Sequence, residues 1–293
     1  MNEMNAPIQW YPGHMAKARR QLADQIRKTD LVIELCDARL PFSSRNPELN
    51  KMVAGKKRIL FLNKADLADP NATKAWTAAF RRDGLDAYPI DATRLRNKEI
   101  LNLIQQATRE LIEKALAKGV RKTIRAMVIG VPNVGKSTMI NRLYGSGITS
   151  TEDRPGVTRS QRWVRINPYL EFLDTPGMLW PRLDDQIAAK RLCYIGSVND
   201  EVVDLYALTI SLLEDLSAHC PETLRTRFHL ESVEPRGTDL LDAACKGRGW
   251  LLKGNRYDYD RACSIILDEF RAGKLGRITL EEPADITEEN QLD

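Results

Sequence analysis

Short apolar runs alternate with longer amphipathic stretches along the first two thirds of the chain. Runs of strand length that are rich in β-branched residues predict strands, and apolar positions that recur every three or four residues predict helices. The expected strands are 31–37, 58–62, 87–90, 125–129, 161–166 and 170–173, and the expected helices are 13–29, 71–83, 97–118 and one that starts at 136. Strands and helices that alternate at this spacing predict an α/β fold, with a mostly parallel sheet wrapped by helices.

The pattern changes near residue 184, where helical stretches begin to dominate and convincing strands disappear. Helices are expected near 184–195, 200–218, 236–246 and 258–272. We therefore divide the chain into an α/β domain, 1–182, a smaller all-α domain, 183–280, and a tail, 281–293. Six carboxylates in the tail predict that it is acidic and disordered; they are Glu281, Glu282, Asp285, Glu288, Glu289 and Asp293.

Composition places the chain among ordinary globular proteins. It has 293 residues, of which 43% are hydrophobic and 29% are charged. No apolar run reaches the ~18 residues that a membrane span needs, and the first ten residues have no signal-peptide pattern. We expect a cytoplasmic protein with no membrane partner. Five cysteines, odd in number and far apart, are expected to be buried free thiols rather than disulfides or metal ligands.

The charge is distributed unevenly. Residues 1–183 carry 31 Lys and Arg against 18 Asp and Glu, a balance of +13, and residues 184–293 carry 13 against 22, a balance of −9. Such an excess of positive charge on the first domain favours an anionic partner larger than a nucleotide. The alternative is that these lysines and arginines are only a solvated surface.

A phosphate-binding loop follows the strand expected at 125–129. The segment Gly130-Val-Pro-Asn-Val-Gly135-Lys136-Ser137 has the Gly-x4-Gly-Lys-Ser pattern between a strand and a helix, which is the context the loop requires. Its glycines let backbone N–H groups surround the phosphates, Lys136 offers a cation, and Ser137 offers an oxygen to Mg²⁺. The nucleotide-binding residues expected here are Asn133, Val134, Gly135, Lys136, Ser137 and Thr138.

The base that accompanies these phosphates is indicated by Asn63-Lys64-Ala65-Asp66, the Asn-Lys-x-Asp motif of GTPases, at the end of another apolar strand. The carboxylate of Asp66 can accept both donors of the guanine edge, which adenine lacks. Lys64 is expected to cover the ring plane, and Asn63 to bind the phosphate loop. A third guanine-recognition element, usually Ser-Ala-Lys, is only partly matched at 91–93, where a backbone contact at Ala92 is expected to reach guanine O6.

A third motif, Asp174-Thr175-Pro176-Gly177, ends the strand expected at 170–173. Asp174 is placed to orient Mg²⁺ through water, and Gly177 to bind the γ-phosphate and let the loop move when that phosphate leaves. Between the motifs lies Arg154-Pro-Gly-Val-Thr158, where Thr158 is the expected sensor of Mg²⁺ and γ-phosphate. An ordinary turn is the alternative for that segment.

The order of the motifs is inverted, because Asp66 precedes the phosphate loop and no second Asn-Lys-x-Asp follows Gly177. The chain therefore resembles the YlqF/YawG group of circularly permuted GTPases. The likeness covers nearly the whole chain and is carried by Trp10-Tyr-Pro-Gly-His-Met-Ala-Lys17, Asp37-Ala-Arg39-Leu-Pro41, Leu62–Asp66, Gly130–Ser137, Pro155–Thr158, Asp174–Gly177 and Asp268-Glu-Phe-Arg-Ala-Gly-Lys-Leu-Gly-Arg277.

The resemblance implies a circularly permuted P-loop GTPase domain followed by a helical domain, with GTP hydrolysis in late assembly of the large ribosomal subunit. GTP and GDP, that subunit and its rRNA are the implied partners, Mg²⁺ is the cofactor, and no DNA is expected. Met178 stands where many GTPases carry a water-orienting glutamine. This is normal in the hydrophobic-substituted class that the resemblance implies, so turnover should be slow alone and stimulated by ribosomal particles.

Two residues are candidates for the missing catalytic help. Asn133 matches the asparagine that K⁺-activated GTPases use to hold a monovalent cation beside the phosphates, and the alternative is that it only stabilises the loop. His14, within the dense N-terminal motif, is a candidate for positioning water, and a structural role is the alternative. The sequence leaves the choice between them open.

A basic group in the helical domain is the candidate RNA contact, through Lys246, Arg248, Lys253 and Arg256. Aromatic residues interleaved with these cations, Trp250, Tyr257 and Tyr259, suit stacking on bases. Two other functions stay open: a GTPase in another RNA process such as tRNA modification, and an RNA-binding scaffold that holds GTP as a structural ligand. Truncation near residue 184 should leave GTP binding intact yet lower the affinity for the large subunit, if the helical domain supplies part of the docking surface.

Overall fold

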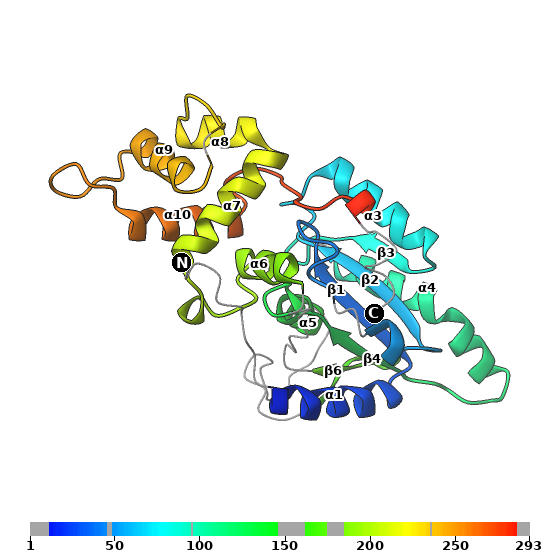
Figure 1. The fold of residues 1–293 in the computed structure, drawn as a ribbon. Coiled ribbons are helices and arrows are strands. Elements are labelled where there is room, and N and C mark those ends of the chain that lie inside the picture. The colour runs from blue at the N-terminus through cyan, green and yellow to red at the C-terminus, as the bar shows by residue number, and fades with distance from the viewer. Residues whose placement is uncertain are drawn as a thin grey trace.

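The computed structural model describes residues 12–45, 49–94, 96–145, 162–174, 185–234 and 236–285. A six-stranded sheet forms its first part (Figure 1). The strands are β1 (Leu31–Asp37), β2 (Lys57–Asn63), β3 (Asp86–Pro89), β4 (Ile124–Ile129), β5 (Arg162–Asn167) and β6 (Leu170–Asp174), in the order β3-β2-β1-β4-β6-β5. Neighbouring strands are parallel except β5, which pairs antiparallel with β6. The predicted α/β architecture is confirmed.

Helices cover both faces of the sheet, and this explains why β1 is buried at every position. Leu31, Ile33 and Leu35 face a core shared with α4 (Asn97–Leu116) and α5 (Lys136–Gly145). Val32 faces the opposite side, where Leu22 and Ile26 of α1 (Pro12–Arg27) pack. On that same side, α3 (Pro70–Arg82) buries Trp76 and Phe80 against β2, and the short α2 (Leu49–Met52) follows the end of β1.

The second part is helical, and three of its helices begin at capping carboxylates. It comprises α6 (Gln186–Tyr194), α7 (Leu205–His219), α8 (Pro221–Phe228), α9 (Thr238–Arg248) and α10 (Tyr259–Arg271), with a 3₁₀ turn at Asp200–Val202. Asp185, Asp204 and Asp258 each accept backbone N–H groups of the first turn of α6, α7 and α10. No helix within the described ranges is long and apolar enough to cross a membrane.

The prediction overlooked α8 because it has only eight residues, and its two apolar side chains, Leu224 and Phe228, are too few to establish a helical period. Pro221 at its first position marks the start, since proline fits the first turn of a helix and cannot continue α7. Leu224 and Phe228 of α8 are buried in the core of the helical part.

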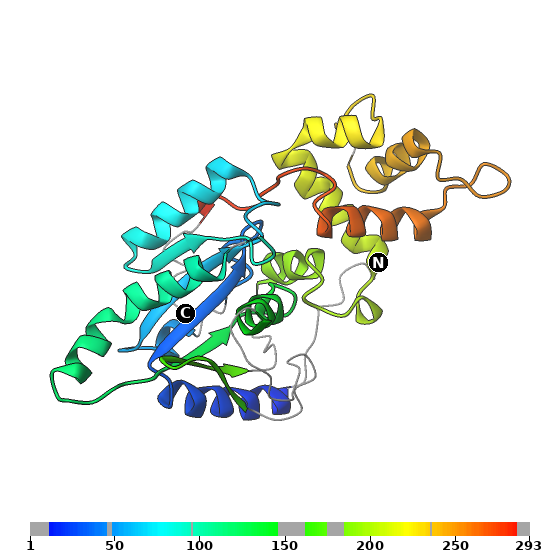
Figure 2. The ribbon, with the colours of Figure 1, turned by 180° about the vertical axis from the view of Figure 1, so that it is seen from behind.

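After α10 the chain returns to the sheet instead of ending in a free tail. Figures 1 and 2 show this segment, in red, running from the end of α10 to the side of α3. Leu280 is fully buried and Glu281 is 2% exposed, and a 3₁₀ turn at Pro283–Asp285 follows. The expectation of a disordered tail from residue 281 is therefore wrong for its first residue, because the Glu281 carboxylate accepts hydrogen bonds from the N–H groups of Phe42 and Ser43. Residues 286–293 lie outside the described residues.

Candidate nucleotide-binding site

The candidate residues gather at one edge of the sheet, because parallel strands place their carboxyl ends together. Asp37 at the end of β1 lies opposite Asn63 at the end of β2. On the other side of β1, β4 leads into the phosphate loop, and β6 beside β4 ends at Asp174. Three motifs that are far apart in the sequence therefore meet at this edge.

The phosphate loop lies in close contact with β1 and with the start of α5. Gly130 has φ of 155°, and a Cβ there would collide with the carbonyl of Leu35, so only glycine fits. Lys136 opens α5 and its Nζ donates a hydrogen bond to the carbonyl of Val131 at 2.6 Å. Burial lowers the pKa of Lys136 to about 8. A phosphate brought to this amine would favour its charged form and offset the burial.

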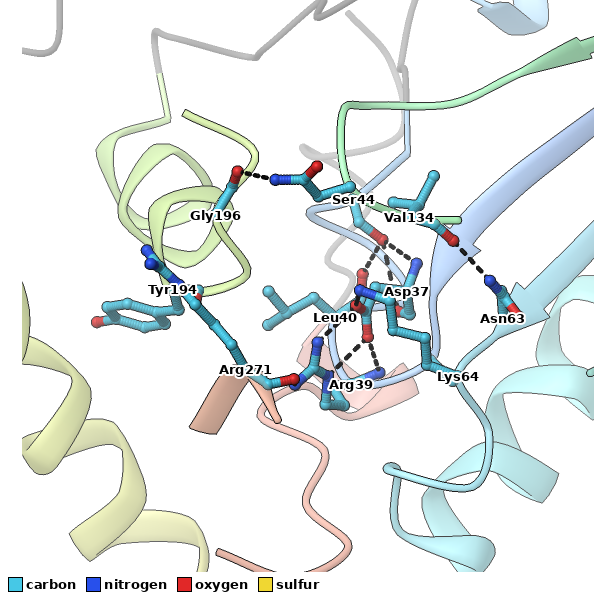
Figure 3. Close-up of polar contacts among 12 residues, drawn as sticks. Asp37, Arg39, Leu40, Ser44, Asn63, Lys64, Val134, Tyr194, Gly196 and Arg271 are labelled. Carbon is cyan, nitrogen blue, oxygen red and sulfur yellow. Dashed lines mark hydrogen bonds and ion pairs between the residues drawn. The ribbon is translucent and has the colours of Figure 1, made fainter. Parts of the chain in front are cut away.

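Asn63 joins the phosphate loop to the guanine-recognition motif, as Figure 3 shows. Its Nδ2 donates to the carbonyl of Val134 at 2.7 Å, and its Oδ1 accepts the N–H of Ala92 at 2.9 Å. Gly135, with φ of 99°, lies so close to the Asn63 amide that any Cβ would collide with it. One buried side chain therefore sets the spacing of three loops.

Ala92 has a different role from the one expected. Its N–H, which we expected to reach guanine O6, donates to Asn63, so Ala92 positions the loop at 91–93 instead of offering a free donor. Asp66 is half-buried and lines a depression of about 1200 Å³ together with Asp91 and Arg277. This depression adjoins the position that a base bound by Asp66 would occupy.

Lys64 is held by Asp37, and Figure 3 shows both beside Arg39. Its Nζ lies 3.0 Å from Asp37 Oδ2, and Arg39 binds both oxygens of the same carboxylate at 2.9 and 2.8 Å. Burial alone would raise the pKa of Asp37, but Arg39 and then Lys64 outweigh it and hold this pKa far below its usual range. In the structure, then, Lys64 bonds to Asp37, whereas we expected it to cover the base.

Sequence reasoning noticed the Asp37-Ala-Arg39 pattern but assigned it no role. Arg39 is 1% exposed, and its Nη1 donates to the carbonyls of Phe270 at 2.8 Å and Arg271 at 3.3 Å. These carbonyls end α10, where a cation is favourable because the last carbonyls of a helix lack partners. The only feature of the sequence that could have indicated this role is an aspartate and an arginine two residues apart at the end of a buried strand.

Two bonds connect the phosphate loop with the helical part. The Asn133 side chain donates to the carbonyl of Gly196, and Ser197 Oγ donates to the carbonyl of Pro132 at 2.7 Å. Both partners follow α6. Asn133 itself has φ of 63°, in the left-handed region, so this bond helps to hold a backbone conformation that side chains rarely adopt.

Several expected site residues are only partly described. Thr158 and Gly177 lie outside the described residues, as does Met178. Asp174 is placed as the last residue of β6, and His14 in the first turn of α1, but their side chains are not described. Ser137 and Thr138 are exposed at the start of α5. A hydroxyl at this helix start and a carboxylate at the end of the adjacent strand suit the oxygen ligands that Mg²⁺ prefers.

The expected RNA contact is partly altered by the structure. Lys246 at the end of α9 is exposed, as are Lys253 and Arg256 in the turn that follows. Arg248 is half-buried, with its guanidinium 5.7 Å from the ring centre of Trp250. Trp250 is 3% exposed and packs against Phe228, so it cannot stack on a base.

Comparisons with known proteins relate the chain to GTPases. A family profile described as "50S ribosome-binding GTPase" matches residues 125–227. The chain is 44% identical to "Ribosome biogenesis GTPase A" of Bacillus cereus over 284 residues, which cover 96% of each protein. It is 30% identical to the protein of the same name in Thermotoga maritima over 280 residues, again 96% of each. The crystal structure of GNP-bound YlqF from T. maritima matches with a TM-score of 0.69 and 27% identity, covering 92% of this chain and all of that one.

Proposed function

Because the chain belongs to the ribosome biogenesis GTPase A family and is a GTPase, we propose that it is a switch in late assembly of the large ribosomal subunit. It docks on the subunit with GTP bound and leaves after hydrolysis. Its partners are the large subunit and its rRNA, and it acts in the cytoplasm. The names of its relatives support a role in ribosome biogenesis. The bonds between the phosphate loop and the helical part support the switch.

Two hydrogen bonds connect the phosphate loop directly with the helical part of the chain. Asn133 and Pro132 lie in the phosphate loop, and their partners Gly196 and Ser197 follow α6. A displacement of the phosphate loop beside the β- and γ-phosphates can therefore move the end of α6 directly, without any rearrangement of the sheet. These two bonds carry the proposal that nucleotide state controls the docking surface.

The site residues take the following roles in this proposal. Asp66 recognises guanine, while Asn63 and Ala92 hold the loops around it. Lys136, Gly177 and the backbone of the phosphate loop, with Thr138 after it, bind the phosphates. Ser137, Thr158 and Asp174 hold Mg²⁺, which the GTPase family generally uses, and the ion neutralises phosphate charge when bound.

Catalytic help comes from Asn133, from His14 or from both. The Nδ2 of Asn133 donates to Gly196, so its Oδ1 is the atom that would bind K⁺. Such a cation would offset negative charge that develops between the β- and γ-phosphates. His14 at the start of α1 would position water if the N-terminal motif reaches the phosphates.

The rRNA contact is proposed for Lys246, Lys253 and Arg256, with Arg248 beside them. The first three are exposed cations on α9 and the turn after it. Phosphate contacts of this kind give binding that falls steeply as salt is raised. These exposed cations and the +13 balance of residues 1–183 both support RNA as an anionic partner that is larger than the nucleotide.

Sedimentation through sucrose tests the proposal. Purified large and small subunits are mixed with the protein and either GDP or a non-hydrolysable GTP analogue, at low and at moderate salt. We expect association with large subunits, stronger with the GTP analogue, and GTP turnover that rises when large subunits are added. Absence of association in both nucleotide states at low salt would contradict the ribosomal role. Stimulation by tRNA alone would favour tRNA modification, and unchanged turnover with every RNA would favour a scaffold.

A further inference from the structure

The segment that follows α10, residues 273–281, contacts the guanine-recognition loop, residues 63–69, along most of its length. We call it the C-terminal strap. Arg277 Nε donates to the carbonyl of Ala68 and its Nη2 to the carbonyl of Ala65, both at 2.9 Å. The N–H of Ile278 donates to the carbonyl of Leu67 at 3.0 Å. The N–H of Asp69 donates to Thr279 Oγ1 at 3.1 Å.

The strap is anchored by burial on either side of Arg277. Leu275, Ile278 and Leu280 are at most 5% exposed. Gly273 has φ of 69°, and a Cβ there would lie 2.6 Å from the Leu67 side chain, so the two segments touch. A distant part of the chain therefore adds its own hydrogen bonds and packing to this irregular loop.

The far end of the strap is fixed to the end of β1 and to α3. The N–H of Leu280 donates to the carbonyl of Arg39 at 3.0 Å, and Trp76 Nε1 donates to the carbonyl of Glu281 at 2.8 Å. The Glu281 carboxylate accepts the N–H of Phe42 at 2.7 Å. With both ends fixed, the strap can hold the position of the loop that it crosses.

The geometry points to Arg277 as a positioning residue for guanine recognition, and this inference rests on the proposed role of Asp66. The carbonyl of Ala65 belongs to the peptide that continues into Asp66, so Arg277 fixes the peptide from which the Asp66 carboxylate projects. Two acceptors on one carboxylate must meet two donors of the guanine edge, and such paired bonds are sensitive to small displacements. The strap thereby makes residues far from the phosphates a determinant of base selectivity.

The contacts of the strap lie on the side of the site where Asp66 would bind the base. GDP and GTP present the same base, so loss of the strap should weaken both by the same factor. The contact between Asn133 and Gly196 lies on the phosphate side and would distinguish the two nucleotides. An equal effect on GDP and GTP affinity therefore indicates a change at the strap, and an unequal effect indicates a change at the contact of Asn133 with Gly196.

Nucleotide affinities of four proteins test the inference. They are the wild type, Arg277→Ala, Arg277→Lys and Thr279→Val, each titrated with GDP, a non-hydrolysable GTP analogue and IDP. Inosine lacks the exocyclic amine, so the ratio of IDP to GDP dissociation constants reports how well Asp66 meets that donor. Lys274→Ala removes an exposed cation of the same segment and is the matched control. Thermal unfolding of each variant monitors the fold.

We expect Arg277→Ala to weaken GDP and the GTP analogue alike, by about tenfold, since two hydrogen bonds from a charged donor are lost at a partly exposed site. The ratio of IDP to GDP dissociation constants should fall towards one, Arg277→Lys should restore part of it, and Lys274→Ala should leave it unchanged. Thr279→Val should shift the ratio in the same direction.

A ratio that stays at its wild-type value in both Arg277→Ala and Thr279→Val would overturn the inference, even if overall affinity or stability dropped. A wild type that binds GDP and IDP equally would overturn the assignment of Asp66, and the inference with it. The two failures are therefore distinguishable.

Discussion

The buried amine of Lys136 makes nucleotide affinity depend on pH between about pH 7 and pH 9. In the structure burial lowers its pKa from the ordinary 10.5 to about 8. The difference corresponds to about 3 kcal/mol that favours the neutral amine. Phosphates favour the charged amine, so the bound state has the higher pKa.

The direction of the pH dependence follows from this difference between the pKa of Lys136 in the free and in the bound protein. Below pH 8 the amine is already charged, and nucleotide binds without taking up a proton. Above pH 8 binding must be accompanied by proton uptake, so the apparent affinity falls about tenfold for each further pH unit until the pKa of the complex is reached. We expect GDP to bind about tenfold more weakly at pH 9 than at pH 7.

Fluorescence titration with labelled GDP between pH 6.5 and 9 measures this effect. Guanosine, measured by competition, carries the same base without phosphates, so the ratio of GDP to guanosine affinity removes any titration of the base. Lys136→Arg provides a second control, because an arginine stays charged over the whole range. A GDP to guanosine ratio that is constant from pH 7 to pH 9 would refute the reasoning.

Four further predictions follow from individual side chains. Asp66→Asn should lose at least about a hundredfold in GDP affinity and most of the preference over ADP, since a donor replaces an acceptor; an unchanged preference in competition binding would exclude Asp66 as the base reader. Asn133→Ala should abolish any excess of GTP turnover in K⁺ over Na⁺ at matched ionic strength; identical wild-type rates in the two salts would exclude the cation. His14→Ala should lower turnover by about 10²–10⁴-fold with little change in GTP affinity, and normal turnover with and without ribosomal particles would leave His14 a structural residue. Truncation after residue 272 should lower the free energy of unfolding by roughly 5 kcal/mol, because three buried apolar side chains of the strap are lost; a denaturant midpoint equal to that of the full chain would contradict this.

Local patterns were sufficient to place most of the elements. The strand at Leu31–Asp37 was predicted with its observed ends, since a run of apolar residues buried on both faces has few other conformations. The phosphate loop was found because its chemistry demands particular residues at fixed spacing. By contrast, the bonds from Arg39 to the end of α10 join residues 231 positions apart. No pattern within a short window can indicate such a pair.

The strap is a second case in which a local pattern could not indicate a contact between distant parts of the chain. Acidic composition after residue 280 predicted disorder, but a single carboxylate can be buried where backbone N–H groups and a hydroxyl donate hydrogen bonds to it, as they do at Glu281. Burial alone would raise the pKa of Glu281, and the neighbouring donors only partly offset this. The expectation that truncation near residue 184 leaves GTP binding intact is therefore withdrawn, because the truncation removes the strap as well.

Arg271 connects the segment that binds the phosphate loop with the helix that precedes the strap. Its guanidinium donates to the carbonyls of Tyr194 at 3.1 Å and Cys193 at 2.9 Å, at the end of α6, and binds Asp200 at 2.7 Å. Its own carbonyl accepts from Arg39. The last turn of α10 therefore contacts the segment that binds the phosphate loop and also leads into the strap that binds the guanine-recognition loop.

A single helix end that is joined to both sides of the site has a consequence for regulation. A partner that displaces α10 would act on the base and on the phosphates together, and by thermodynamic reciprocity nucleotide would change the affinity of that partner by the same factor. The base side alone cannot distinguish GTP from GDP, since both present the same guanine. If the chain is a switch, it therefore needs contacts on the phosphate side of the site, such as that of Asn133 with Gly196, whereas a factor that only accelerates release of either nucleotide needs no more than a shift of the strap.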